Sequence, residues 1–244
     1  SLGYLTADKG GGFHLKVADW QVQRENGRDD LKALMEGYSL ELTLAEVKPP
    51  VVHGATGFIA VAEGEEGSYY YSRTKMVAKG KLSDHGTELG VEGFAWFDHQ
   101  WGDFTLKDGG GWDWFGLQLD DGSELMVSKI RGVDGREVVL YGTHVDSKGV
   151  STHLAAEDIR VKATGSWRSP SSGAEYPMGW TLAVPRLALE LELQPVVQNQ
   201  EMDTTASTGI IYWEGEVKVV GRRGSAAVGG LGYVELTGYA AKAN

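Results

Sequence analysis

The sequence contains no cysteine, and only 6 of its 244 residues are proline. The missing thiols exclude disulfides, cysteine nucleophiles and cysteine-based metal sites, although they do not fix the compartment. Basic residues are also scarce, 23 against 34 acidic ones, which gives a formal net charge of −11. Because phosphate binding requires clustered lysine and arginine, we expect no nucleic-acid partner, and an anionic membrane surface is disfavoured for the same reason.

Long apolar runs and helical patterns are missing as well. No run approaches the roughly 18 apolar residues of a membrane span, so we expect no integral membrane span. The best short helix candidate is Asp29 to Glu36, and Leu154 to Asp158 could form one turn. The chain has no serine elbow, phosphate loop, zinc-protease motif or dinucleotide fingerprint, and its six histidines are scattered. We therefore expect neither a metal nor a cofactor.

Alternation with period two dominates what is present. Apolar and polar residues alternate from Tyr38 to Leu44 and from Leu187 to Leu193, and 35 glycines suit tight turns. The prediction is an all-β chain. His53 to Gly67 is Gly-rich and acidic, and we interpret it as a loop. The pattern from Trp112 onward gives about eight strands, which suits a closed antiparallel barrel.

The strands ahead of Trp112 are fewer, about five, which is too few for a complete barrel. We therefore expect the first of two domains to be partial. The predicted division places the first domain at residues 1–106 and the second at 107–244.

The stretch from Gly93 to Asp120 carries four of the eight tryptophans, and a Gly-rich break divides it into two extended runs. In the first run, Phe97, His99 and Trp101 share one strand face, and Asp98 lies on the other. An imidazole between two rings would stay neutral near pH 7 and could exchange a proton. The alternative is a histidine hydrogen-bonded within a barrel wall.

The second run places Asp113 on an otherwise apolar face and Trp112, Trp114 and Gln118 on the other. Burial would keep the Asp113 carboxyl protonated, as a general acid requires, or Asp113 could cap backbone amides at the strand end. Gln118 beside two indoles would suit a polar contact in an apolar pocket, and a solvent-facing strand residue is the alternative.

A second polar and aromatic cluster contains Gln200, Trp213 and Glu214. Glu214 shares a strand face with Tyr212 and Glu216, so paired carboxylates could do acid–base work there, although a solvated strand face has the same pattern. Tyr71, in a run of three tyrosines, would either line a pocket or pack.

Several motifs together resemble one known family. They are YYYSRTKM from Tyr69, VEGFAWFDHQWG from Val91, GWDWFGLQLDDGSELM from Gly111, WRSPSSGAEYP from Trp167, NQEM from Asn199, YWEGEVKVVG from Tyr212 and GYVELTGY from Gly232. The chain resembles the lipocalin-like family of carotenoid 1,2-hydratases (CrtC-like) and AttH-type proteins. The resemblance implies two consecutive lipocalin-like antiparallel β-barrel domains, with a pocket at their junction and an N-terminal family motif that this sequence lacks.

The resemblance also implies an activity. His99 and Trp101 match the family's His-x-Trp element, Asp98 precedes it, and Asp113 is our candidate for the family's aspartate. The leading hypothesis is a hydratase-, isomerase- or cyclase-type acid–base enzyme acting on a C=C bond of an apolar polyene or terpenoid. Indoles at Trp101, Trp112 and Trp114 would stabilise a carbocation.

Two alternatives are a non-catalytic carrier of hydrophobic ligands and a secreted hydrolase. The expected partner is a hydrophobic small molecule, and a homodimer is a further partner to test. A periplasmic or secreted location follows from the resemblance alone.

Overall fold

The computed structural model describes residues 4–7, 11–60, 67–103 and 110–240 of the chain. Regular structure within these ranges consists of antiparallel strands and two short 3-10 helices, η1 (Ala156–Asp158) and η2 (Pro185–Leu187). The prediction of an all-β, lipocalin-like fold is confirmed. Among the described residues, no helix is long and apolar enough to cross a membrane.

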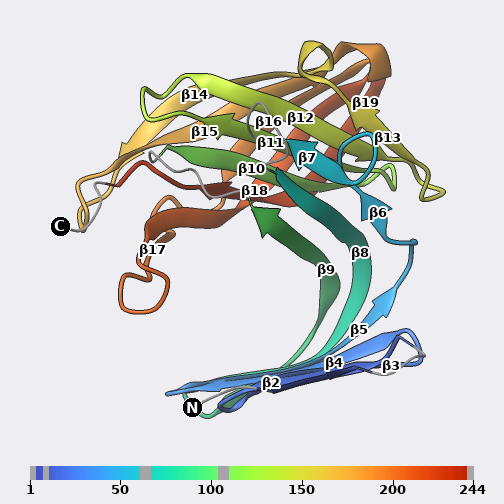
Figure 1. The fold of residues 1–244 in the computed structure, drawn as a ribbon, viewed down its shortest axis with the longest axis vertical. Coiled ribbons are helices and arrows are strands. Elements are labelled where there is room, and N and C mark those ends of the chain that lie inside the picture. The colour runs from blue at the N-terminus through green and yellow to red at the C-terminus, as the bar shows by residue number, and fades with distance from the viewer. Residues whose placement is uncertain (1–3, 8–10, 61–66, 104–109, 241–244) are drawn as a thin grey trace. The chain divides into compact units, whose positions relative to one another are not determined.

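The first sheet contains nine strands in the order β1-β2-β3-β4-β5-β8-β6, and β7 and β9 also pair with β8 (Figure 1). The bounds are β1 (Tyr4–Ala7), β2 (Phe13–Val17), β3 (Trp20–Glu25), β4 (Arg28–Met35), β5 (Tyr38–Glu46), β6 (Val51–Val52), β7 (Phe58–Ala60), β8 (Gly67–Asp84) and β9 (Thr87–Asp103).

The helix candidate from Asp29 to Glu36 was wrong. This segment is strand β4, which pairs along its length with β5 and over its first half with β3. Its backbone hydrogen bonds are thus made with neighbouring strands, and tertiary pairing overrides a weak local helix preference. The expected turn near Leu154 to Asp158 is present as η1.

The second sheet contains ten strands and curls around its core (Figure 1). Its order is β13-β12-β11-β10-β19-β18-β16-β15-β14, and β17 pairs with β18. The bounds are β10 (Gly111–Leu119), β11 (Glu124–Arg131), β12 (Glu137–Val145), β13 (Ser151–Leu154), β14 (Arg160–Arg168), β15 (Glu175–Val184), β16 (Leu189–Pro195), β17 (Glu201–Asp203), β18 (Ile211–Arg223) and β19 (Ala226–Leu236). The sequence suggested about eight strands, because β13 and β17 are too short to show a periodic pattern.

The chain forms two compact units, one from Ser1–Pro50 and Arg73–Phe97, the other from Val51–Ser72 and Asp98–Asn244. Strands β8 and β9 contribute residues to both units. The predicted domain division between residues 106 and 107 falls outside the described residues and stays a prediction.

The first unit combines a small apolar core with a buried ion network. Leu44, Met76 and Ala78 form the core. The Arg73 guanidinium, 5% exposed, donates to the Asp29 carboxylate and lies 2.6 Å from Glu46 Oε1. A buried guanidinium requires such compensation, because an unpaired buried charge is strongly destabilising.

The second unit has a large core on one face of its sheet. The odd-numbered residues of β10, including Phe115 and Leu117, point into it, and Trp180 packs against Trp213 with ring centroids 6.4 Å apart. Since side chains alternate along a strand, the even-numbered residues of β10 lie on the opposite face. That opposite face carries the polar residues analysed below.

A matched pair of leucines tests this assignment of faces. Leu117 is 0% exposed in the core, whereas Leu231 is 53% exposed on β19. We expect Leu117→Ala to lower the free energy of unfolding by about 2–5 kcal/mol. Leu231→Ala should change it by less than about 0.5 kcal/mol. Urea denaturation of the two variants measures both values, and equal losses would contradict the assignment.

Candidate functional site

A line of polar side chains crosses five strands of the second sheet on the face opposite the core. Direct cross-strand pairing joins each residue to the next, from β12 through β11, β10 and β19 to β18. We call this line the polar row, and its members are Tyr141, Ser128, Trp114, Glu235 and Glu214. The row brings together residues from both ends of the second sheet's sequence.

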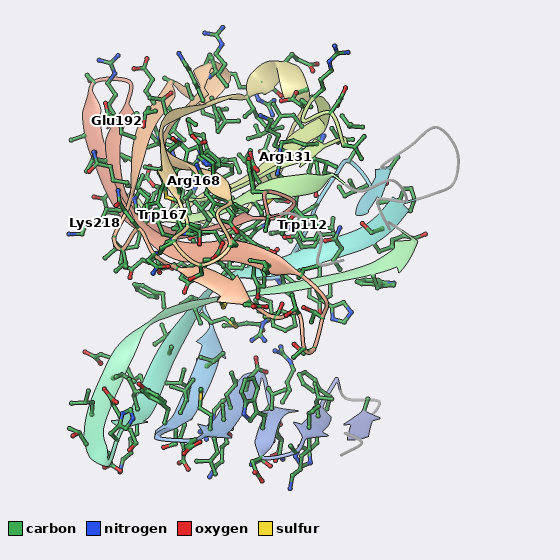
Figure 2. The ribbon with its side chains drawn as sticks, turned by 90° about the vertical axis from the view of Figure 1, so that its left-hand side faces the viewer. Trp112, Arg131, Trp167, Arg168, Glu192 and Lys218 are labelled. Carbon is green, nitrogen blue, oxygen red and sulfur yellow. The ribbon has the colours of Figure 1, made fainter. Side chains whose placement is uncertain are left out.

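Glu214 and Glu235 occupy directly opposite positions on β18 and β19. Burial, with repulsion from Glu214 next, raises the pKa of Glu235 to about 7, while a hydrogen bond from Trp112 opposes the rise. Burial also raises the pKa of Glu214, and repulsion from Asp98 adds to it. A carboxylic acid near neutrality is suited to proton transfer at physiological pH. Trp112 is labelled in Figure 2.

The described residues of the segment Val51–Ser72, 51–60 and 67–72, cover part of this face. Tyr70 accepts a hydrogen bond of 2.9 Å from the Trp114 indole nitrogen. Gly116 leaves room for that indole, because a Cβ at this position would come within 2.3 Å of the Trp114 ring. Burial raises the pKa of Tyr70 well above its usual value, so Tyr70 remains a protonated phenol. Burial likewise raises the pKa of Tyr141, to about 12.

A buried histidine connects the covering segment to the sheet. His53 is 0% exposed, and its Nδ1 lies 2.9 Å from Thr143 Oγ1 on β12. Its Nε2 lies 2.6 Å from Ser72 Oγ, and the Ser72 hydroxyl in turn donates to the Asp98 carboxylate. Burial, with a smaller effect of His153, lowers the pKa of His53 to about 3. The imidazole is therefore neutral at physiological pH.

Asp98 links this hydrogen-bonded chain to the polar row. Its charge raises the pKa values of Tyr70, Tyr141, Glu214 and Glu235, in each case after burial as the larger cause. Asp98 is itself solvent-exposed. The Asp98 and Glu235 carboxyl groups therefore influence each other electrostatically.

His99 and Trp101 occupy the other face of β9 from Asp98. His99 stacks on Tyr71 with ring centroids 5.5 Å apart, and Trp101 stacks on Tyr69 at 5.7 Å. His99 and Trp101 also meet edge to face at 4.9 Å. The structure thus brings three sequence-predicted residues, Tyr71, His99 and Trp101, into one aromatic cluster, and separates that cluster from Asp98.

Asp113 lies on the core face at the end of β10. Its Oδ1 is 3.2 Å from Arg131 Nε and accepts a hydrogen bond of 2.8 Å from the Tyr239 hydroxyl. Asp113 and Arg131 are 6% and 7% exposed. This pairing binds the last turn of the described chain to β10 and β11.

The remaining predicted residues are Gln118, Trp213 and Gln200. Gln118 lies on the polar face of β10, opposite Glu124. Trp213 is 0% exposed in the core and donates a 2.7 Å hydrogen bond to the Gln198 carbonyl. The Gln200 amide donates to the Val197 carbonyl at 2.8 Å and packs over Gly215.

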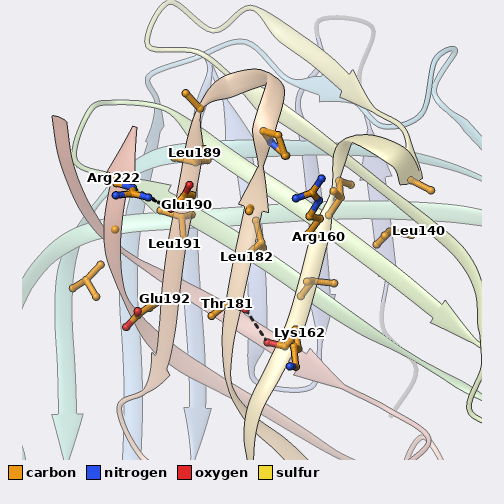
Figure 3. A pocket seen from close by; sticks show the side chains of 18 of the residues that line it. Leu140, Arg160, Lys162, Thr181, Leu182, Leu189, Glu190, Leu191, Glu192 and Arg222 are labelled. Carbon is orange, nitrogen blue, oxygen red and sulfur yellow. Dashed lines mark hydrogen bonds and ion pairs between the residues drawn. The ribbon is translucent and has the colours of Figure 1, made fainter. Parts of the chain in front are cut away.

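A surface hollow of about 1140 Å³ lies along β14, β15 and β16, away from the polar row (Figure 3). Its described lining includes Leu140, Leu189 and a Glu190–Arg222 ion pair, and none of the polar row. We base the candidate site on the perturbed carboxyls and not on this hollow, because cross-strand ion pairs on exposed strands are an ordinary solvated surface. No group of three or more His, Asp or Glu within the described ranges could hold a metal ion.

Sequence reasoning did not identify His53, Ser72 or Glu235. His53 lies in a segment interpreted as a loop, and Glu235 alternates with apolar residues as any solvated strand residue does. For Glu235 a weak signal existed in the motif GYVELTGY, where this glutamate lies between the apolar residues Val234 and Leu236. Without the strand pairing, the sequence could not show that His53 lies beside Thr143 or that Glu235 lies opposite Glu214.

Comparison with known proteins gives consistent matches. The AttH-like family model matches residues 3–239. The crystal structure of a protein described as AttH from Nitrosomonas europaea superposes with a TM-score of 0.85 at 32% identity, covering 96% of this chain and 72% of that one.

Two more distant relatives match, one in structure and one in sequence. Kievitone hydratase from Nectria haematococca gives a TM-score of 0.77 at 17% identity, covering 96% of this chain and 73% of that one. The dehydratase asqC of Emericella nidulans is 20% identical over 206 residues, 81% of this chain. The chain spans 58% of the length of that dehydratase.

The buried, neutral His53 predicts a pH dependence of stability. Its pKa is lower in the folded state than in the unfolded chain, so the unfolded state takes up a proton first as the pH falls below about 6.5. His53 therefore makes the free energy of unfolding fall with decreasing pH, by up to about 1.4 kcal/mol per pH unit. We expect His53→Gln to remove this slope in denaturant titrations between pH 7 and pH 4. The exposed His85 provides the control, since His85→Gln should retain it.

The raised pKa of Glu235 predicts a pH dependence of stability with the opposite sign. Its pKa is higher in the folded state, so stability is full below the unfolded value and is lost as the pH rises through about 7. We expect Glu235→Gln to match the wild-type stability near pH 4 and to exceed it by at most about 3 kcal/mol at pH 8. Glu216→Gln, two residues from Glu214 on the same face of β18, is the control. A difference between wild type and Glu235→Gln that stays constant with pH would contradict the assignment.

Proposed function

Because the chain belongs to the AttH-like family, we propose that it is an acid–base enzyme of the hydratase or dehydratase type, acting on a C=C bond of an apolar small molecule. The observation that carries this proposal is the raised pKa of the Glu235 carboxyl, about 7, to which the charge of Asp98 contributes. Two carboxyl groups with different ionisation can divide the roles of acid and base.

Glu235 is the proposed general acid. In the hydration direction its proton is transferred to one alkene carbon, and the other carbon becomes a carbocation. Asp98 is the proposed general base, which takes a proton from the water that attacks this cation. One water is added to the double bond, Glu235 loses one proton and Asp98 gains one, so the step balances. The reverse sequence is dehydration.

Aromatic side chains around Glu235 fit a cationic intermediate. Trp112 and Trp114 lie on the same face of β10, and Trp112 hydrogen-bonds to Glu235. Tyr212 and Tyr233 are close enough to the glutamates for their pKa values to be raised, burial being the main cause. The π faces of such rings stabilise positive charge. Gln118, on the same face, is proposed as a polar contact for the substrate.

The other predicted residues receive separate proposed roles. His99, Trp101 and Tyr71 form an aromatic contact surface that we propose for binding. Asp113, in its ion pair with Arg131, is proposed to stabilise the fold, and so are the core residue Trp213 and the turn residue Gln200. Glu214 is proposed to raise the pKa of Glu235 through electrostatic repulsion.

Relatives support the reaction class without defining the substrate. One relative is a hydratase and another is a dehydratase, and these names describe the two directions of one reaction. A hydrolase using Ser72 is less well supported, because Ser72 is 0% exposed and its hydroxyl donates to Asp98, and not to His53, while Asp98 is ionised.

Isotope incorporation provides the test. The protein is incubated with a panel of apolar polyenes and terpenoid alcohols in water enriched in heavy oxygen, and products are identified by mass spectrometry. We expect gain or loss of one water in at least one substrate, and a decrease in kcat of about 10²–10⁴-fold in Glu235→Gln. The matched Glu216→Gln variant should retain the activity.

Three outcomes separate the alternatives. Recovery of bound but chemically unchanged ligand would indicate a carrier. Full turnover by Glu235→Gln would remove Glu235 from the mechanism. A rate that does not fall as the pH rises above about 7 would contradict its role as acid, because only the protonated carboxyl can donate.

A further inference from the structure

The chain of hydrogen bonds behind Asp98 has a defined direction. An ionised carboxylate can only accept, so the Ser72 hydroxyl donates its one proton to Asp98. Ser72 Oγ must then accept from His53 Nε2, which places the imidazole proton on Nε2. Nδ1 carries no proton in that tautomer and accepts from the Thr143 hydroxyl. Both imidazole nitrogens and the two hydroxyl groups thus have partners, and Ser72 also hydrogen-bonds to Tyr70.

Protonation of Asp98 would reverse every bond in this chain. The new carboxyl proton would be donated to Ser72 Oγ, and the Ser72 hydroxyl would turn to donate to His53 Nε2. The imidazole proton would then lie on Nδ1 and be donated to Thr143 Oγ1. Hydroxyl groups can act as donor or acceptor, so both arrangements satisfy the same buried atoms.

We propose that His53 is a positioning residue whose neutral imidazole changes tautomer as Asp98 gains or loses its proton. Ser72 carries the change from one residue to the other. This inference deepens the proposed function, on which its catalytic meaning rests, because it allows the base to become protonated without leaving a buried donor unpaired.

Two features favour a tautomer change over protonation of the ring. His53 is 0% exposed and its ring packs at a tilt against Tyr70, with centroids 4.2 Å apart, so a charged imidazolium would be poorly solvated. His153 adds repulsion to any positive charge there. Asp98 in turn interacts electrostatically with Tyr70, Tyr141, Glu214 and Glu235.

Nuclear magnetic resonance of the whole chain tests the inference without any substrate. Nitrogen-15 labelling of histidine distinguishes the two neutral tautomers and the imidazolium, and carbon-13 labelling of aspartate follows Asp98, assigned by comparison with Asp98→Asn. We expect the Nε2–H tautomer of His53 while Asp98 is ionised. The Nδ1–H tautomer should replace it with the same pH midpoint as Asp98.

A matched pair of serines tests the connection. Ser72→Ala should abolish the coupling between the His53 tautomer and Asp98. Ser68→Ala should preserve it, since Ser68 lies on the same face of β8 and accepts a 2.7 Å hydrogen bond from Gln100 instead. If Ser72→Ala fails to fold, the titration of the wild-type protein still decides.

A His53 tautomer that stays fixed while Asp98 titrates would overturn the inference, and so would conversion of His53 to imidazolium over that range. These results are distinct from those that test the activity. A coupled tautomer change in a protein without turnover would refute the proposed function alone, whereas turnover with a fixed tautomer would refute this inference alone.

Discussion

Burial, together with electrostatic repulsion between carboxyl groups on one half-buried sheet face, sets the ionisation of Glu214 and Glu235. Glu214 and Glu235 are directly opposite on neighbouring strands, where like charges are unfavourable. Burial makes ionisation of both more costly, and Asp98 adds a third negative charge. The least costly arrangement leaves Glu235 partly protonated near neutrality. The proposed acid is therefore a consequence of strand register and burial, not of an unusual residue.

The two-residue period of strands allows one sheet to hold both a core and a polar site. On β10, Phe115 and Leu117 face the core, whereas Trp114 belongs to the polar row on the opposite face. The same period on β9 separates Asp98 from the aromatic cluster of His99 and Trp101. A slip of one residue in register would exchange the two faces, so stability and chemistry depend on the same pairing.

The segment Val51–Ser72 supplies what the second sheet lacks by itself. It places Tyr70 against Trp114, and it places His53 between Thr143 and Ser72. Its residues come from before β9 in the sequence, yet they pack in the second unit. Covering the polar face with this segment produces the burial that shifts the ionisation of Tyr70 and His53.

The sequence by itself determined the all-β class, from alternation and turn residues, and its motifs identified the correct family. It also nominated Asp98, which precedes the family's His-x-Trp element, and Trp114 and Glu214, which belong to clusters of aromatic and acidic residues. It proposed a helix over Asp29–Glu36, where pairing with β3 and β5 decided for a strand. Only the tertiary structure decided that Glu235 faces Glu214 and that His53, 90 positions from Thr143, is buried against it. The reason is physical: a glutamate or histidine has the same local sequence pattern in water as in a site, and its proton affinity is set by neighbours that only long-range pairing brings close.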